Sequence, residues 1–104
     1  MQRKAFKMKL KPGCVAEYKK RHDEIWPELA QAHIDAGISD YSIYFDEETL
    51  TLFAFQKLTD DNTAGGLKDM EIVKRWWDHM ANLMETHSNN MPICQPLVEV
   101  FHMD

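Results

Sequence analysis

Residues 41–58 read YSIYFDEETLTLFAFQKL and predict a β-hairpin. Side chains alternate over residues 41–45, and residues 52–58 form a second strand-like run. The acidic segment 46–49 between them is typical of a hairpin loop. Aromatic or apolar side chains occur on both alternation phases: Tyr41 and Phe45 against Tyr44, and Phe53 and Phe55 beside Leu52 and Ala54. The hairpin is therefore expected to have two apolar faces.

An amphipathic helix is expected before the hairpin. Its apolar or aromatic residues recur every three or four positions and share one face: Val15, Tyr18, His22, Ile25, Leu29, Ala32 and Ala36. Gly37 is a suitable C-cap for this helix. Pro27 lacks an N–H group and clashes with the carbonyl group one turn earlier, so we expect a kink or a break at residues 23–26.

A second amphipathic helix is expected after the hairpin. Its apolar face consists of Met70, Val73, Trp77, Met80 and Met84, and Asp69 is expected to cap its N-terminus. The polar residues 59–68 before it predict an irregular, mobile loop over a site. Two further strands are expected, one over residues 6–11 before the turn at Pro12-Gly13 and one over residues 97–103.

The order strand, helix, strand, strand, helix, strand predicts a ferredoxin-like α+β fold, βαββαβ. Four antiparallel strands would carry two helices on one face, and the 104 residues would form a single domain, 1–104. Because two helices cover only one face of such a sheet, the second apolar face suggests sheet-to-sheet packing between two copies. We therefore expect a homodimer, a dimeric α/β barrel.

The composition argues against several classes of partner. Lys and Arg number 12 against 17 Asp and Glu, and the net charge of −5 disfavours binding to nucleic acid. The apolar runs are too short to span a membrane, and the first residues lack the apolar core of a signal peptide. Cys14 and Cys94 show no zinc-ligand or disulfide pattern, so we expect two free thiols in a cytoplasmic protein.

His22 is the most unusual position of the first helix. It occupies an otherwise apolar face, one turn after Tyr18 and one turn before Trp26. One interpretation is a core histidine with both ring nitrogens hydrogen-bonded. The other is a proton donor and acceptor, because the ordinary histidine pKa lies near neutral pH. For a lone histidine the first interpretation is the more common one. Three features strengthen the second: Tyr18 on the same face, the Pro27 kink, and the acidic pair Asp23 and Glu24.

Trp76 and Trp77 are the second candidate feature. Neighbouring residues on a helix point about 100° apart, so the two indoles cannot share the centre of one face. Trp77 belongs to the apolar face and is expected to fill the core, whereas Trp76 lies on the flank and could line a cleft. Paired indoles can also stack on a sugar and donate to its hydroxyl groups. The remaining histidines, with His33 and His79 on outer helix faces, show no metal-ligand spacing.

Several motifs along the whole chain are similar to one known family. They are Arg3-Lys4-Ala5-Phe6, Glu17-Tyr18 with Arg21-His22, Ile25-Trp26-Pro27-Glu28-Leu29, Tyr41-Ser42-Ile43-Tyr44, Leu52-Phe53-Ala54, Arg75-Trp76-Trp77 and Glu99-Val100-Phe101. These motifs resemble the L-rhamnose mutarotases. The resemblance implies a dimeric ferredoxin-like fold and cofactor-free interconversion of the α and β anomers of L-rhamnose in rhamnose catabolism. It further implies that His22 is the proton donor and that Tyr18, Tyr41, Trp76 and Trp77 bind the sugar.

This chemistry agrees with the residues. Mutarotation opens a cyclic hemiacetal and recloses it on the other face, and general acid–base catalysis with correct positioning is sufficient for it. The fold alone leaves two alternatives open. One is a small haem-degrading monooxygenase, in which His and Trp would be ligand and pocket residues. The other is a sugar-binding module without catalytic activity.

Overall fold

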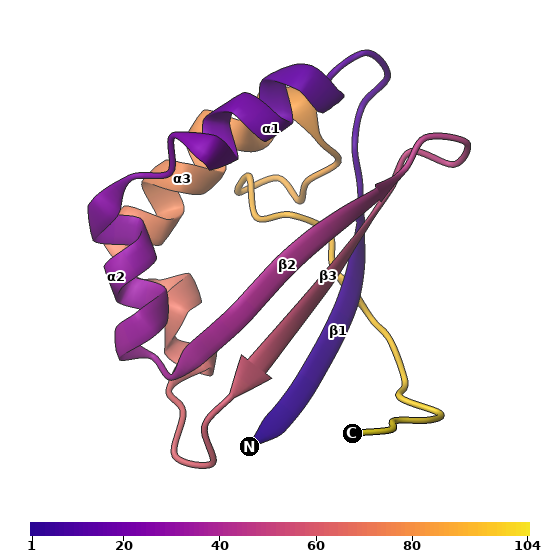
Figure 1. Cartoon of the computed structure of the whole chain (residues 1–104). Coiled ribbons are helices and arrows are strands. Elements are labelled where there is room, and N and C mark those ends of the chain that lie inside the picture. Colours follow the sequence, from indigo (N-terminus) through magenta and orange to yellow (C-terminus); the bar gives the residue numbers. More distant parts are fainter.

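The computed structural model describes all residues from Met1 to Asp104. Its elements are β1 (Gln2–Lys9), α1 (Val15–Asp23), α2 (Pro27–Asp35), β2 (Ile38–Asp46), β3 (Thr51–Leu58), the 3₁₀ helix η1 (Ala64–Asp69), α3 (Glu71–Met80), the 3₁₀ helix η2 (Ala81–Leu83) and β4 (Gln95–Pro96). The strands form one antiparallel sheet in the order β2-β3-β1-β4, and the helices cover one face of it (Figure 1). The ferredoxin-like α+β prediction is confirmed.

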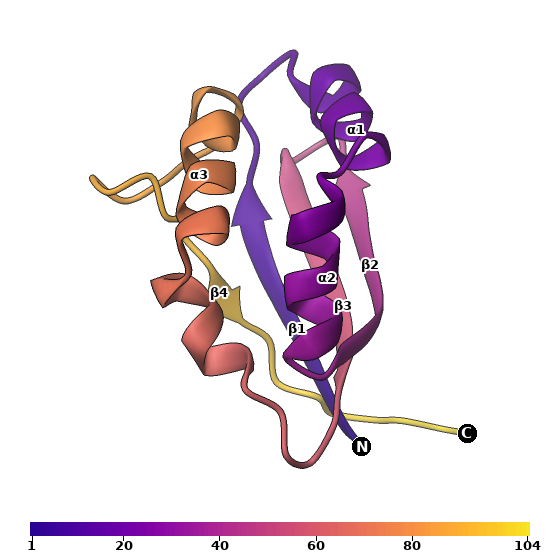
Figure 2. The ribbon, with the colours of Figure 1, turned by 90° about the vertical axis from the view of Figure 1, so that its left-hand side faces the viewer.

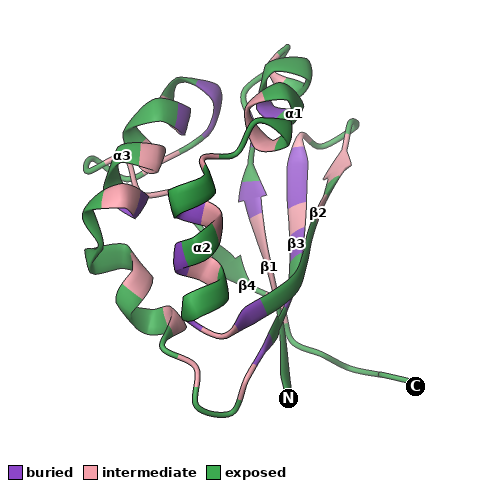
Figure 3. Cartoon of the chain, turned by 60° about the vertical axis from the view of Figure 1, so that its left-hand side comes forward, coloured by how far each residue is buried: buried purple, intermediate pink, exposed green.

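The core lies between the sheet and the helices. Leu52 and Ala54 of β3 face the helices, and Met8 of β1 pairs directly with Leu52. Met80 and Leu83 cover them from the helix side, and all five residues belong to one buried cluster. Figure 3 shows buried residues in the strands and on the sides of the helices that face the sheet, with exposed residues on the outer sides of the helices. Burial of these apolar side chains is the main force that holds the two layers together.

Pro27 breaks the first predicted helix into two. It begins α2 at the first helical position, where its missing N–H group costs nothing. Trp26 before it is extended, with φ −63° and ψ 128°, as expected for a residue that precedes proline. The expected break is confirmed, and the sheet therefore carries three α-helices rather than two. Figure 2 shows α3 beside the α1–α2 pair over the sheet.

The segment before α3 differs from the prediction. Residues 64–69 form η1, so the stretch 59–68 is not irregular throughout. Asp69 ends η1 and does not cap α3; the N-cap is Met70, which is extended and has no side-chain capping bond. The segment is also attached to the end of α2, because the Thr59 N–H donates to the Gly37 carbonyl at 3.0 Å and the Thr63 N–H to the Ala36 carbonyl at 2.9 Å. Helical periodicity encodes neither these backbone bonds nor the 3₁₀ turn.

The last strand is much shorter than predicted. β4 comprises only Gln95–Pro96, and residues 97–104 have no regular structure. Pro96 cannot donate to a ladder, and the Leu97 N–H makes the last backbone bond to β1, 2.9 Å from the Ala5 carbonyl oxygen. Val98 and Val100 are then 85% and 92% exposed. Beyond Leu97, the strand-like segment makes no backbone hydrogen bond to another strand.

The helices are all short. None of them has the length and apolar character that crossing a membrane requires.

Candidate functional site

A cavity of about 980 Å³ lies between the helices and the sheet. Its walls include side chains from α1, α2 and α3 and from the inner face of the strands. All five residues expected at the site line it: Tyr18, His22, Tyr41, Trp76 and Trp77. The tertiary structure thus brings together residues that lie far apart in the sequence, from Tyr18 to Trp77.

His22 lies on the cavity wall in a defined orientation. Its Nδ1 atom is 3.0 Å from the carbonyl oxygen of Tyr18, one turn earlier on α1. A carbonyl oxygen can only accept, so Nδ1 carries a proton and Nε2 remains as the atom that can exchange a proton with a ligand. Nε2 makes no hydrogen bond within the chain and is not sealed in the core. The structure therefore differs from a core histidine with both nitrogens bonded.

Aromatic rings surround His22. The Tyr18 ring lies against it with centroids 4.3 Å apart, and the Trp76 ring meets it edge-on at 5.4 Å. Burial lowers the pKa of His22 below its ordinary value of 6.5, although the Tyr18 carbonyl and the Asp23 carboxylate act in the opposite direction. The imidazole is therefore neutral at neutral pH, and Nε2 is a proton acceptor in the resting protein.

Tyr18 supplies a phenol to the same wall. It is the one residue of α1 that is buried, 7% exposed, and it belongs to the core cluster. Burial raises the pKa of its hydroxyl strongly, and the nearby Tyr41 and Cys94 raise it further. The hydroxyl is consequently protonated at neutral pH and can donate a hydrogen bond.

A β-bulge directs Tyr41 toward the helices. Asp40 and Tyr41 together oppose the single residue Gln56 of β3, and Asp40 has a left-handed φ of 48°. The extra residue allows Ile38 and Ile43, five positions apart, to pair with inward-facing residues of β3. Tyr41 keeps a ring surface accessible, 39% exposed, but its hydroxyl is buried, which raises its pKa to about 12. Nearby Cys94 adds to this increase, and the Gln56 amide opposes it.

Trp76 and Trp77 are both half-buried on α3. Trp76 packs against the core cluster and also contacts His22, so it fills the core edge and lines the cavity at once. Its ring is further held edge-on by Trp26, with centroids 5.1 Å apart. Trp77, which the periodicity assigns to the core, also borders the cavity.

Three comparisons with known proteins bear on this arrangement. A family model described as L-rhamnose mutarotase matches residues 3–103. The chain belongs to the L-rhamnose mutarotase family. The resemblance seen in the sequence is confirmed, and with it the expected class of enzyme, a mutarotase, which is an isomerase.

Curated relatives match this L-rhamnose mutarotase family member over its full length. The L-rhamnose mutarotase of Bacteroides thetaiotaomicron is 56% identical and covers 100% of both chains. That of Jannaschia sp. is 55% identical over 103 residues, 99% of each chain. The crystal structure of an L-rhamnose mutarotase from Formosa agariphila superposes with a TM-score of 0.93 at 53% identity, covering 100% of both chains.

The cavity of this mutarotase family member contains residues that the sequence analysis missed. His33 was expected on an outer face, but it is half-buried at the cavity wall, with its ring 5.9 Å from that of Tyr41. Its Nδ1 atom lies 2.9 Å from the Leu29 carbonyl oxygen, the same anchoring as in His22. The prediction was wrong because His33 lies one turn after the buried Leu29 and next to the buried Ala32, so it borders the inward face of α2. His79, by contrast, is exposed.

Gln56 and Cys94 also line the cavity. Gln56 could have been found, because it occupies the inward phase of β3 between the buried residues Ala54 and Leu58. Cys94 lies just before β4, in a segment without periodicity, and burial raises the pKa of its thiol. The structure contains no group of three or more His, Cys, Asp or Glu side chains arranged to hold a metal ion.

Proposed function

We propose that this chain interconverts the α and β anomers of L-rhamnose, with His22 as the proton-transfer residue. The observation that carries the proposal is the orientation of His22: Nδ1 is held by the Tyr18 carbonyl, and Nε2 is left for a ligand in the cavity. Family membership indicates L-rhamnose as the substrate, and the geometry places a group that can transfer protons in the cavity.

The reaction follows from the protonation states. Neutral His22 takes the proton of the anomeric hydroxyl, the C1–O5 bond breaks, and O5 receives a proton from a second donor. The open-chain aldehyde rotates about C1–C2. O5 then attacks the other face of C1 and returns its proton to the second donor, while the His22 imidazolium donates its proton to O1. His22 is thus the proton donor in ring closure. Two tyrosines that can donate a proton border the cavity, Tyr18 and Tyr41, and both hydroxyls are neutral.

The other residues are proposed to bind the sugar. The indole faces of Trp76 and Trp77 can stack on the C–H-rich surface of a pyranose, and their N–H groups can donate to hydroxyls. Tyr18 and Tyr41 would hydrogen-bond further sugar hydroxyls. The reaction transfers protons without net oxidation or reduction of the sugar, so it requires no redox cofactor.

Saturation-transfer NMR between the two anomeric protons of L-rhamnose tests the proposal. We expect the exchange rate to rise in proportion to the protein concentration. Binding of the sugar with exchange at the uncatalysed rate would instead support the non-catalytic binding module. Stoichiometric haem binding with a Soret band, without an effect on exchange, would support the haem-degrading alternative.

The rate should depend on pH through His22. Protonation of Nε2 removes the proton acceptor, so catalysed exchange should fall as the pH drops through a pKa below 6.5. It should stay level up to about pH 9, because both tyrosines titrate well above that pH. Exchange rates measured from about pH 5 to about pH 9, corrected for the uncatalysed reaction, check this. A rate that rises toward low pH would mean that imidazolium is the resting form.

We also propose that the chain forms a homodimer through the outer face of its sheet and acts in the cytoplasm. Tyr44 of β2 and Phe55 of β3 lie on that face, 66% and 44% exposed, with ring centroids 5.9 Å apart. Two adjacent exposed rings on an otherwise regular sheet favour burial against a second copy. The free thiols of Cys14 and Cys94 support a reducing compartment.

Sedimentation at micromolar concentration checks the dimer. We expect a species of twice 12.2 kDa, and Phe55→Asp should shift it toward the monomer because a carboxylate would be buried in the interface. Lys20→Asp, at an exposed position of α1 away from that face, is the control and should leave the dimer intact. A wild-type species that remains near 12.2 kDa would disprove the dimer.

A further inference from the structure

We propose that Arg21 is a positioning residue for the reaction: it ties α1 to the C-terminal end of α3 and so holds the His22 ring against Trp76. The inference rests on the proposed role of His22. Arg21 does not line the cavity and would act through its neighbour rather than on the sugar.

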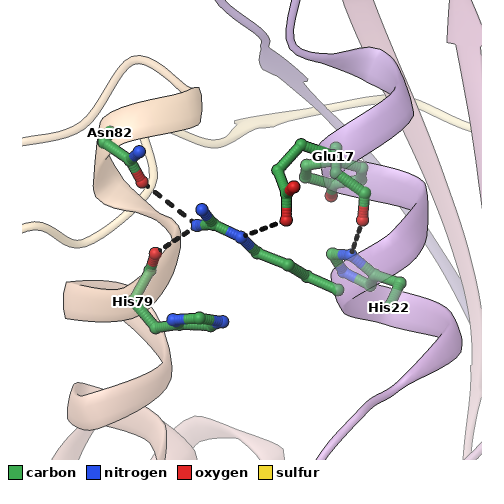
Figure 4. A network of polar contacts seen from close by, with 6 residues as sticks. Glu17, His22, His79 and Asn82 are labelled. Atoms are coloured by element: carbon green, nitrogen blue, oxygen red, sulfur yellow. Dashed lines mark hydrogen bonds and ion pairs between the residues drawn. The ribbon is translucent and has the colours of Figure 1, made fainter.

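Three hydrogen bonds fix the guanidinium group (Figure 4). Its Nε atom donates to the Glu17 carboxylate at 3.0 Å, within α1. One terminal nitrogen donates to the backbone carbonyl of His79 at 2.5 Å and to the side-chain oxygen of Asn82 at 3.1 Å. The Arg21 side chain is only 18% exposed, so these bonds are partly shielded from water. Arginine suits this role because its planar group presents several donors in fixed directions.

The acceptors on the far side lie where α3 ends. α3 finishes at Met80, and the last carbonyl groups of a helix have no partners within it. Arg21 provides a donor for one of them, and its positive charge is favourable at a helix C-terminus. Asn82 belongs to η2, so the same guanidinium also holds the turn that follows.

This cross-link joins the two helices that meet in the site. Arg21 precedes His22 directly, and His79 follows Trp76 by three residues, about one helical turn. The contact between the His22 and Trp76 rings therefore spans the same helix pair. α1 has only nine residues and buries only Tyr18, so it is too short to be stable alone. Directional bonds from Arg21 supply the constraint that apolar packing of α1 lacks.

Arg21→Met tests the proposal, because methionine keeps much of the apolar stem and removes every donor. We expect kcat for anomer exchange to fall by about 10- to 100-fold, with a smaller change in KM, since small misplacements of a catalytic group have effects of this size. The pKa of His22, followed by NMR of its ring, should move up toward the ordinary value as α1 loosens and water reaches the ring. A role in overall stability alone would leave that pKa unchanged in the folded protein.

Two further variants complete the experiment. Lys20→Met, at the exposed neighbouring position of α1, controls for loss of a cation and should retain wild-type kcat. In Arg21→Ala, added guanidinium ion at non-denaturing concentration should restore part of the activity. If Arg21→Met does not fold, Asn82→Ala takes its place, and a smaller loss of kcat with the same upward movement of the His22 pKa is expected.

The results that would overturn the positioning role of Arg21 differ from those that would overturn the proposed function. A folded Arg21→Met protein with kcat within about twofold of wild type, or with an unmoved His22 pKa, would overturn the positioning role. If Arg21→Met does not fold and Asn82→Ala is used instead, an unchanged kcat in Asn82→Ala would also overturn the positioning role. Failure of the proposed function looks different, because wild-type protein would then be inactive or His22→Ala fully active.

Discussion

Replacing His22 with alanine is expected to slow anomer exchange by a factor of about 10²–10⁴, the range typical of losing a general acid–base group. The effect should be large because Nε2 of His22 is held in one orientation by the Nδ1 bond to Tyr18 and by the surrounding rings. The protein should remain folded, because His22 is not part of the buried core cluster.

Saturation-transfer NMR measures the loss, and thermal unfolding checks the fold. His33→Ala is the matched control: His33 has the same Nδ1 anchoring and borders the same cavity, but it lies beside Tyr41. We expect His33→Ala to slow anomer exchange several-fold at most.

Tyr18→Phe should slow anomer exchange less than His22→Ala does, since it removes one hydroxyl and keeps the ring. Near-normal exchange in a folded His22→Ala protein would exclude His22 from proton transfer.

Replacing Gly37 with alanine should destabilise the protein by about 2–4 kcal/mol through two separate effects. Gly37 has a φ of 90°, which an L side chain rarely adopts. An added Cβ atom would also come within 2.3 Å of the Thr59 hydroxyl oxygen and 3.3 Å of the Asn62 backbone. The Gly37 carbonyl accepts from the Thr59 N–H, so relief of the clash would disturb the segment that leads to η1.

Urea unfolding measures this change, and Gly13→Ala separates the two effects. Gly13 has a similar φ of 77°, but an added Cβ would meet nothing within 4 Å. We expect Gly13→Ala to cost about 1–2 kcal/mol, the price of the backbone conformation alone. Equal losses in the two variants would show that the segment after β3 yields easily and that the clash contributes little.

The order and type of most elements could be predicted from the sequence, because periodicity and turn chemistry depend on neighbouring residues. The hairpin of residues 41–58 appears as β2 and β3, and its acidic loop is the connection between them. Pro27 ends one helix and begins the next, as its missing N–H group requires. The five candidate site residues also meet at one cavity, although the sequence found them partly through the family resemblance rather than through spacing.

The full set of side chains that face the cavity depends on contacts between distant residues and could not be predicted from the sequence. His33 reaches the cavity wall because it lies one turn after the buried Leu29 and next to the buried Ala32, and periodicity alone does not show how far a cavity extends around a helix. Ile38 shares a face with Tyr41 and Ile43 only through the bulge at Asp40, which depends on pairing with β3. Arg21 finds its acceptors 58 and 61 residues away, at the end of another helix. These features arise from contacts between residues distant in sequence. The same dependence explains the C-terminal segment: residues 97–103 have a strand-like pattern but form no strand, because no strand of this chain pairs with them.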